Sequence, residues 1–299
     1  MPLKNGWTER DYAIFRAVFG GFLFVHFVQL LPWSAEVFSN AGALPDGAAS
    51  PLLSLFPNVL AVWDTPFFVG ALLACGAASS LLLAAGRHDR IAAFVLWYIL
   101  ACLFGRNPLI SNPSLPYVGL LLLAHASLPH ASRKLSTART ATVDTNSTWS
   151  MKPSVYLVVW ILMACGYSYS GYIKLDSPSW MDGTALVRVL ENPLARISPL
   201  RDALLSLPAF LLRLATWGAL LLELLFAPLV LWRRARPFVW GVMLLMHLAL
   251  VVLVNFAELS AGMILLHLFT CDPRWFRRAR TPRSTSHEMT RANHTRARA

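Results

Sequence analysis

The sequence predicts an all-α fold, a polytopic membrane helix bundle of about eight spans. Of its 299 residues, 56% are hydrophobic and 14% are charged, whereas about a quarter of a typical soluble domain is charged. The basic residues give a net charge of +11, but they lie in short blocks between apolar stretches. Lipid is therefore predicted to be the main solvent, and a nucleic-acid partner is not predicted.

Eight apolar windows are candidates for these spans. Five are long enough to cross about 30 Å of hydrocarbon as helices, namely residues 11–31, 65–85, 154–173, 209–232 and 237–254. Three windows are shorter, and their length also suits re-entrant or buried helices; they are residues 91–106, 114–130 and 257–270. The first window has the length of a span and follows basic residues, so we interpret it as an uncleaved helix.

The charge pattern favours eight spans over seven. Residues 86–90, 131–152, 233–236 and 271–299 each carry net positive charge, whereas the connection 32–64 is acidic. With eight spans, all four positive blocks lie on one side, which the positive-inside rule makes the cytoplasmic side. The prediction is a multi-pass protein of the inner (cytoplasmic) membrane with both termini in the cytoplasm.

The predicted organisation has three parts. Residues 1–10 form a cytoplasmic arm, residues 11–273 form one transmembrane domain, and residues 274–299 form a basic tail. The tail has too few apolar residues for a core, so we predict that it is disordered and near anionic lipid. The apolar, proline-punctuated connection 174–208 is expected to lie in or near the membrane interface. The four cysteines have no metal-ligand spacing, and no metal site is predicted.

Ionisable side chains inside spans are the first functional candidates, because lipid makes them costly. His26, Glu223 and His247 lie inside apolar windows, and Lys174 directly follows another. A lysine at a helix end can also extend to the interface with no further role. A buried glutamate can be protonated and structural, and a neutral histidine can bridge helices or relay protons.

The residues before Lys174 give it a distinctive helix face. Tyr167, Ser170, Gly171 and Lys174 follow the i, i+3, i+4, i+7 spacing, so small or hydroxyl-bearing groups lead to the amine. This face leaves room for a ligand, and close helix packing through small residues is the alternative. Pro228 lies soon after Glu223 and removes a helix hydrogen bond, which favours a protein-facing position for that region.

The run Ser170-Gly-Tyr-Ile-Lys174-Leu-Asp-Ser-Pro-Ser-Trp180-Met-Asp-Gly183 resembles the signature of the HTTM family, the vitamin K-dependent gamma-carboxylase-like membrane domain. Shorter matches keep the family's order over about residues 10–276. They are Ala-Ile-Phe-Arg16-Ala-Val-Phe-Gly20, Trp217-Gly-Ala-Leu-Leu-Leu-Glu223-Leu, Met246-His247, Gly262-Met263 and Asp272-Pro-Arg-Trp275.

The resemblance implies a catalytic role for Lys174 as the base that deprotonates a reduced, vitamin K-like quinone. Glu223 and His247 would then orient groups or relay protons, in an outward-facing pocket. Its other implied members are Tyr167, Ser170, Tyr172, Trp180, Asp182 and His26. A lysine must be neutral to act as a base, and burial disfavours the ammonium. A chamber poor in water would also protect reactive intermediates.

Two departures from the family's carboxylases keep other functions open. Those enzymes have an Asn-His pair before the span that aligns with residues 114–130, where this chain has Ser111-Asn112-Pro113-Ser114. They also carry a large lumenal domain, whereas only the basic tail follows residues 257–270 here. The expected function is therefore a carboxylase-like or quinol-oxidising activity, or a non-catalytic membrane partner or maturation factor for a redox or secreted protein. A transporter is a third alternative, although no inverted repeat supports it.

Overall fold

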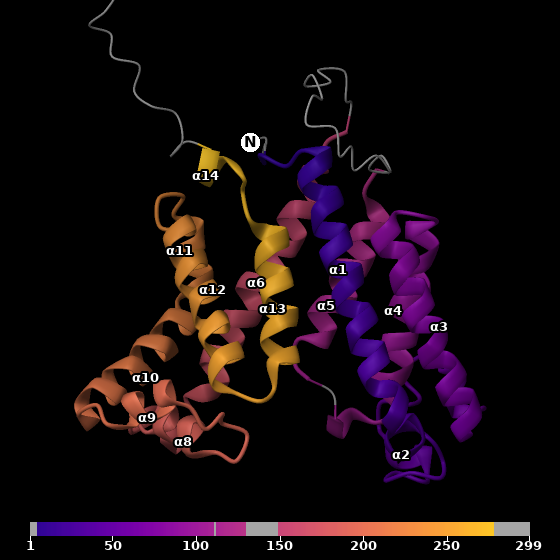
Figure 1. Ribbon diagram of the computed structural model, residues 1–299. Coiled ribbons are helices and arrows are strands. Elements are labelled where there is room, and N and C mark those ends of the chain that lie inside the picture. The colour runs from indigo at the N-terminus through magenta and orange to yellow at the C-terminus, as the bar shows by residue number, and fades with distance from the viewer. Residues whose placement is uncertain (1–4, 111, 130–148, 278–299) are drawn as a thin grey trace, which may run out of the picture.

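The computed structural model describes residues 5–110, 112–129 and 149–277, and within these ranges the repeating structure is helical (Figure 1). The longer helices are α1 (Glu9–Leu30), α3 (Pro66–Ala85), α4 (Asp89–Arg106), α5 (Leu115–Ser127), α6 (Pro153–Lys174), α10 (Ala209–Leu224), α12 (Arg236–Leu253) and α13 (Ala257–Thr270). The shorter α-helices are α2 (Ser34–Phe38), α7 (Pro178–Met181), α8 (Ala185–Glu191), α9 (Pro199–Leu205), α11 (Phe226–Leu231) and α14 (Arg274–Arg277). Four 3-10 turns complete the list: Leu31–Trp33, Gly47–Ala49, Val59–Ala61 and Pro108–Ile110.

The all-helical, membrane-type prediction is confirmed in its coarser form. By length and composition, four helical stretches can cross a bilayer: Glu9–Phe38, α3, α6 and α12. A fifth is possible if α9 and α10, which meet at 104°, form one broken span. The helices α5 and α13 have only 13 and 14 residues. Eight spans are therefore not established by helix length alone.

The window 209–232 was predicted as one span, and the structure divides it into two helices. The helix α10 ends at Leu224 and α11 begins at Phe226. Pro228 has no N–H to continue the hydrogen-bond ladder from α10. The N–H of Ala227 instead donates to Ser168 Oγ on α6, at 3.0 Å. The break is thus stabilised by a side chain of the neighbouring helix.

Local sequence signals explain where several helices begin and end. Thr8 and Asp11 form a reciprocal capping box at the start of α1. Thr65 caps α3, whose first residue is Pro66, the position where proline costs no hydrogen bond. Gly86, with φ of +67°, ends α3 in the left-handed conformation, which suits glycine.

Small residues allow the helices to approach closely. A Cβ on Gly20 of α1 would collide with Ala84 of α3, and one on Gly76 of α3 would collide with Phe27 of α1. Gly171 of α6 lies against the backbone of Leu224 in α10. Such contacts are typical of helix pairs in membranes, where close packing replaces the hydrophobic effect as the driving force.

The bundle has two chemically different ends (Figure 1). The segments 86–90, 232–236 and 271–277 lie at the end where the described chain begins, which we call the basic end. The helices α2 and α7–α9 lie at the other end, which we call the α7–α9 end. Most of the positive block 131–152 and the tail beyond residue 277 lie outside the described residues, as does Ser111.

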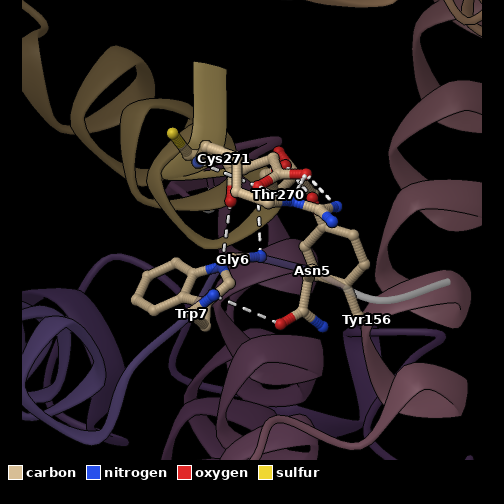
Figure 2. Close-up of polar contacts among 8 residues, drawn as sticks. Asn5, Gly6, Trp7, Tyr156, Thr270 and Cys271 are labelled. Carbon is tan, nitrogen blue, oxygen red and sulfur yellow. Dashed lines mark hydrogen bonds and ion pairs between the residues drawn. The ribbon is translucent and has the colours of Figure 1, made fainter. Parts of the chain in front are cut away.

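At the basic end, the first described residues are bonded to the segment after α13 (Figure 2). The indole N–H of Trp7 donates to the Cys271 carbonyl at 2.8 Å, and the Gly6 N–H donates to Asp272 Oδ1 at 3.0 Å. Burial raises the pKa of Asp272, but its hydrogen bonds from Arg274 and Gly6 outweigh this and hold the pKa below its ordinary value. Part of the predicted N-terminal arm is thus tied to the bundle.

Candidate functional site

An ion pair joins the last residue of α6 to α10. The Lys174 ammonium donates to the carboxylate of Glu223, and the side chains are 22% and 6% exposed. Ser170 Oγ, one turn earlier on α6, donates to the same carboxylate oxygen at 3.0 Å. Gly171 lets the two backbones approach at this point. The small residues on this face of α6 therefore serve close packing against α10. The same close packing brings Lys174, Ser170 and Glu223 together in a polar cluster.

Trp180 covers the Lys174 amine. Its ring centroid lies 4.4 Å from Nζ, a cation–π distance. The turn that carries Trp180 is fixed to α10, since Trp217 Nε1 donates to the Met181 carbonyl at 3.2 Å. Gly183, with φ of +79°, packs against Trp217 in the same place. Lys174 and Trp180 of the Ser170–Gly183 run and Glu223 of α10 thus meet at one amine.

Two residues of the expected pocket lie apart from this cluster. Tyr172 is 62% exposed on the surface of α6. Asp182 is exposed and accepts from the Thr184 N–H at 2.8 Å and from Thr184 Oγ1 at 2.6 Å. These hydrogen bonds lower the pKa of Asp182. Its contacts serve the turn into α8 and not the Lys174 amine.

A second polar cluster lies deeper along the same face of α6. The Tyr167 hydroxyl is 2.7 Å from Nε2 of His247 on α12 and 2.7 Å from Nε2 of His267 on α13. All three residues are buried. A hydroxyl has one proton, so it donates to one imidazole and accepts from the other. The three groups therefore form a directional hydrogen-bonded chain across three helices.

The two clusters are neighbours. Tyr167 and Lys174 are seven residues apart on one helix face, about 10 Å along the axis. In the described part of the chain, the Nδ1 atoms of His247 and His267 are buried without a hydrogen-bond partner. The hydrogen-bonded chain thus ends in two buried nitrogen atoms that have no partner among the described residues.

The sequence analysis assigned no role to His267, which lies in the short window 257–270. The side chain is fully buried. The rule that ionisable residues in spans are functional candidates would have selected it, had it been applied to the short window 257–270.

His26 does not join this pocket, contrary to expectation. Its Nδ1 lies 3.0 Å from Glu258 Oε1 on α13, and it lines a separate cavity beside α1 and α4. The helix α13 packs on both α1 and α6. The polar residues in the apolar windows therefore divide between two sides of α13.

No cluster of three or more His, Cys, Asp or Glu side chains arranged to bind a metal occurs among the described residues. No family model, curated protein or solved structure matches this chain. The chemistry of the site therefore has to be argued from its own geometry.

Proposed function

We propose that this chain is an HTTM-type multi-pass membrane protein in which Lys174 acts as a general base on a lipid-soluble quinol. The observation that carries the proposal is the environment of the amine. Within the segment that resembles the HTTM signature, Lys174 contacts a buried carboxylate and an indole ring. The Ser170 hydroxyl donates to the same carboxylate, that of Glu223. Lys174 would be the base of such a reaction, Glu223 the group that orients it, and Trp180 the aromatic ring that shields the amine.

The proposal includes eight passes through the inner membrane with both termini in the cytoplasm. Its support is that each of the eight apolar windows is helical, the sixth as α10 followed by α11. Three basic segments also lie at one end of the bundle (Figure 1). On this topology the basic end is cytoplasmic, and Lys174 lies toward the outer side.

The Lys174–Glu223 pair has two protonation states of equal net charge. In one, an ammonium faces a carboxylate; in the other, an amine faces a carboxylic acid. A low-dielectric site disfavours separated charges, so moving one proton to Glu223 yields the free amine without burying a net charge. The amine then accepts the hydroxyl proton of the quinol, and the new ammonium is stabilised by the quinolate and by the Trp180 ring. Glu223 orients the amine throughout.

The Tyr167–His247–His267 chain provides a route for protons between His247 and His267. Reversal of its hydrogen bonds moves a proton from one terminal Nδ1 toward the other without movement of the helices. This assigns His247 and Tyr167 to proton transfer and adds His267 to the predicted set.

A second candidate function is a non-catalytic membrane partner or maturation factor for a redox or secreted protein. It is favoured by the closed Lys174–Glu223 ion pair, which would stabilise the turn after α6 even without a substrate. Four cavities in the described part of the chain are also lined by residues other than Lys174. On this view, the motif is a structural connection between α6, α7 and α10.

The two functions are separated by the quinone content and the oxygen consumption of the purified protein. Detergent-purified protein is extracted and searched by mass spectrometry for bound quinones, and oxygen uptake is followed after reduced quinone is added. Bound quinone and quinol-dependent uptake that disappear in Lys174→Ala support the base. A stable protein complex with neither signal supports the partner function.

A further inference from the structure

A cavity of about 200 Å³ lies near the α7–α9 end, between α1, α4 and the first residues of α5 and α13. Its walls are mainly apolar and include the aromatic rings of Trp33, Phe38 and Phe104. Four polar residues also line it: His26, Asn107, Asn112 and Glu258. The Asn107 side chain is already engaged, since it donates to the Val37 carbonyl and accepts from the Leu109 N–H. An apolar cavity with a few placed polar groups is the usual form of a small-molecule site.

Glu258 fixes the hydrogen-bonding role of His26. The histidine is 4% exposed, and its Nδ1 lies 3.0 Å from Glu258 Oε1. An ionised carboxylate only accepts hydrogen bonds, so the neutral His26 ring carries its proton on Nδ1 and leaves Nε2 as an acceptor. Among the described residues, His26 has no second hydrogen-bond partner. The cavity therefore offers one oriented acceptor.

Asn112 supplies the complementary donor. The residue is 2% exposed, and its Oδ1 accepts from the Ser114 N–H at 2.8 Å and from Ser114 Oγ at 2.5 Å. With the carbonyl oxygen occupied in this way, the amide N–H groups are the part of the side chain left for a ligand. The described residues provide no other partner for them.

We propose that this cavity is a binding site for a small molecule with one ring and one hydroxyl group, of the phenol class. The hydroxyl donates to His26 Nε2 and accepts from Asn112 Nδ2, while the ring packs against Trp33, Phe38 and Phe104. The Glu258 carboxylate disfavours anionic ligands by charge repulsion. An ether of the same shape cannot donate to His26. The site is separate from Lys174 and does not depend on the function proposed for it.

The test uses the full-length protein in detergent and ¹⁹F NMR with two probes, 4-fluorophenol and its methyl ether 4-fluoroanisole. The wild type is expected to bind the phenol at least about tenfold more tightly than the ether, because an unpaired buried acceptor is costly. His26→Phe is expected to weaken phenol binding by about tenfold. Glu258→Gln, which can donate to Nδ1 and so reverse the role of Nε2, is expected to reduce the preference for phenol. Glu191→Gln, the same change at an exposed position on α8, is expected to leave it unchanged.

Equal affinity of the two probes for the wild type would overturn the proposal and leave the cavity as an apolar hollow. Unchanged phenol binding by His26→Phe would also overturn it. If His26→Phe does not remain monodisperse, Leu115→Trp is measured instead, because it fills the cavity and leaves the His26–Glu258 pair in place. Phenol binding that persists in Leu115→Trp would contradict the site.

Discussion

The side chains of Lys174 and Glu223 form an ion pair across α6 and α10, although 49 residues separate them in the chain. The pair depends on the absence of a side chain at Gly171, which lies against the backbone of Leu224. Helix packing and site chemistry are therefore coupled at this point.

Gly171→Ala is expected to destabilise the protein by about 1–3 kcal/mol, because the added methyl group collides with backbone that cannot rotate away. Thermal unfolding in detergent measures the loss. Gly218→Ala in α10 is the matched control, since a Cβ there meets nothing within 4 Å. Equal effects of the two changes would show that α6 and α10 do not pack as described.

Tyr167→Phe is expected to destabilise by about 1–3 kcal/mol, because it removes the partner of both buried histidine nitrogens. Tyr172→Phe removes the same hydroxyl from an exposed position of the same helix and is expected to be neutral. The two variants are compared by thermal unfolding. A neutral Tyr167→Phe would mean that the hydrogen-bonded chain is not formed.

The contact between the first residues and Asp272 is expected to weaken in acid. The pKa of this carboxyl is below its ordinary 3.8 in the folded protein. Its contribution to stability is therefore complete above that value and is lost as the pH falls through the folded pKa. Melting temperatures measured from pH 6 to pH 3 should fall less steeply for Asp272→Asn than for the wild type.

The control for this pH series is Asp202→Asn, since the Asp202 side chain is 64% exposed. Its melting temperatures should follow the wild type. Identical pH profiles for Asp272→Asn and the wild type would show that Asp272 does not hold the first residues in place.

The orientation is tested with single cysteines on opposite ends of the bundle. Asp46→Cys, in the acidic connection after α2, is expected to react with a membrane-impermeant maleimide on intact cells. Arg234→Cys, between α11 and α12, should react only after the cells are opened. Each change is made in a background that lacks the native cysteines. The reverse labelling pattern would contradict a cytoplasmic basic end.

Composition and apolar windows were enough to predict the longer helices, because lipid requires long apolar stretches whose backbone bonds are satisfied internally. Pro228 indicated a lost helix hydrogen bond, but the sequence could not place the break at Leu225 or predict that Ser168 of another helix accepts from Ala227. The window lengths also could not settle how many helices cross the membrane.

The candidate site was predictable where its residues are close in sequence. The spacing from Tyr167 to Lys174 placed these side chains on one helix face, as the structure shows. The pairing of Glu223 with Lys174 and of His267 with Tyr167 joins different helices, which no local pattern specifies. His26 was grouped with Lys174 because both are ionisable. In the structure, α13 packs against both α1, which carries His26, and α6, which carries Lys174, and Glu258 of α13 pairs with His26.

The central claim, that Lys174 is the base, is tested most directly by the initial rate of quinol-dependent oxygen uptake in the wild type, Lys174→Ala and Lys152→Ala. Lys152 precedes α6 at its other end and donates to the Ser127 carbonyl, so it controls for loss of a lysine beside the same helix. The account predicts a rate at least about a hundredfold lower for Lys174→Ala and a wild-type rate for Lys152→Ala. A wild-type rate in Lys174→Ala would contradict it.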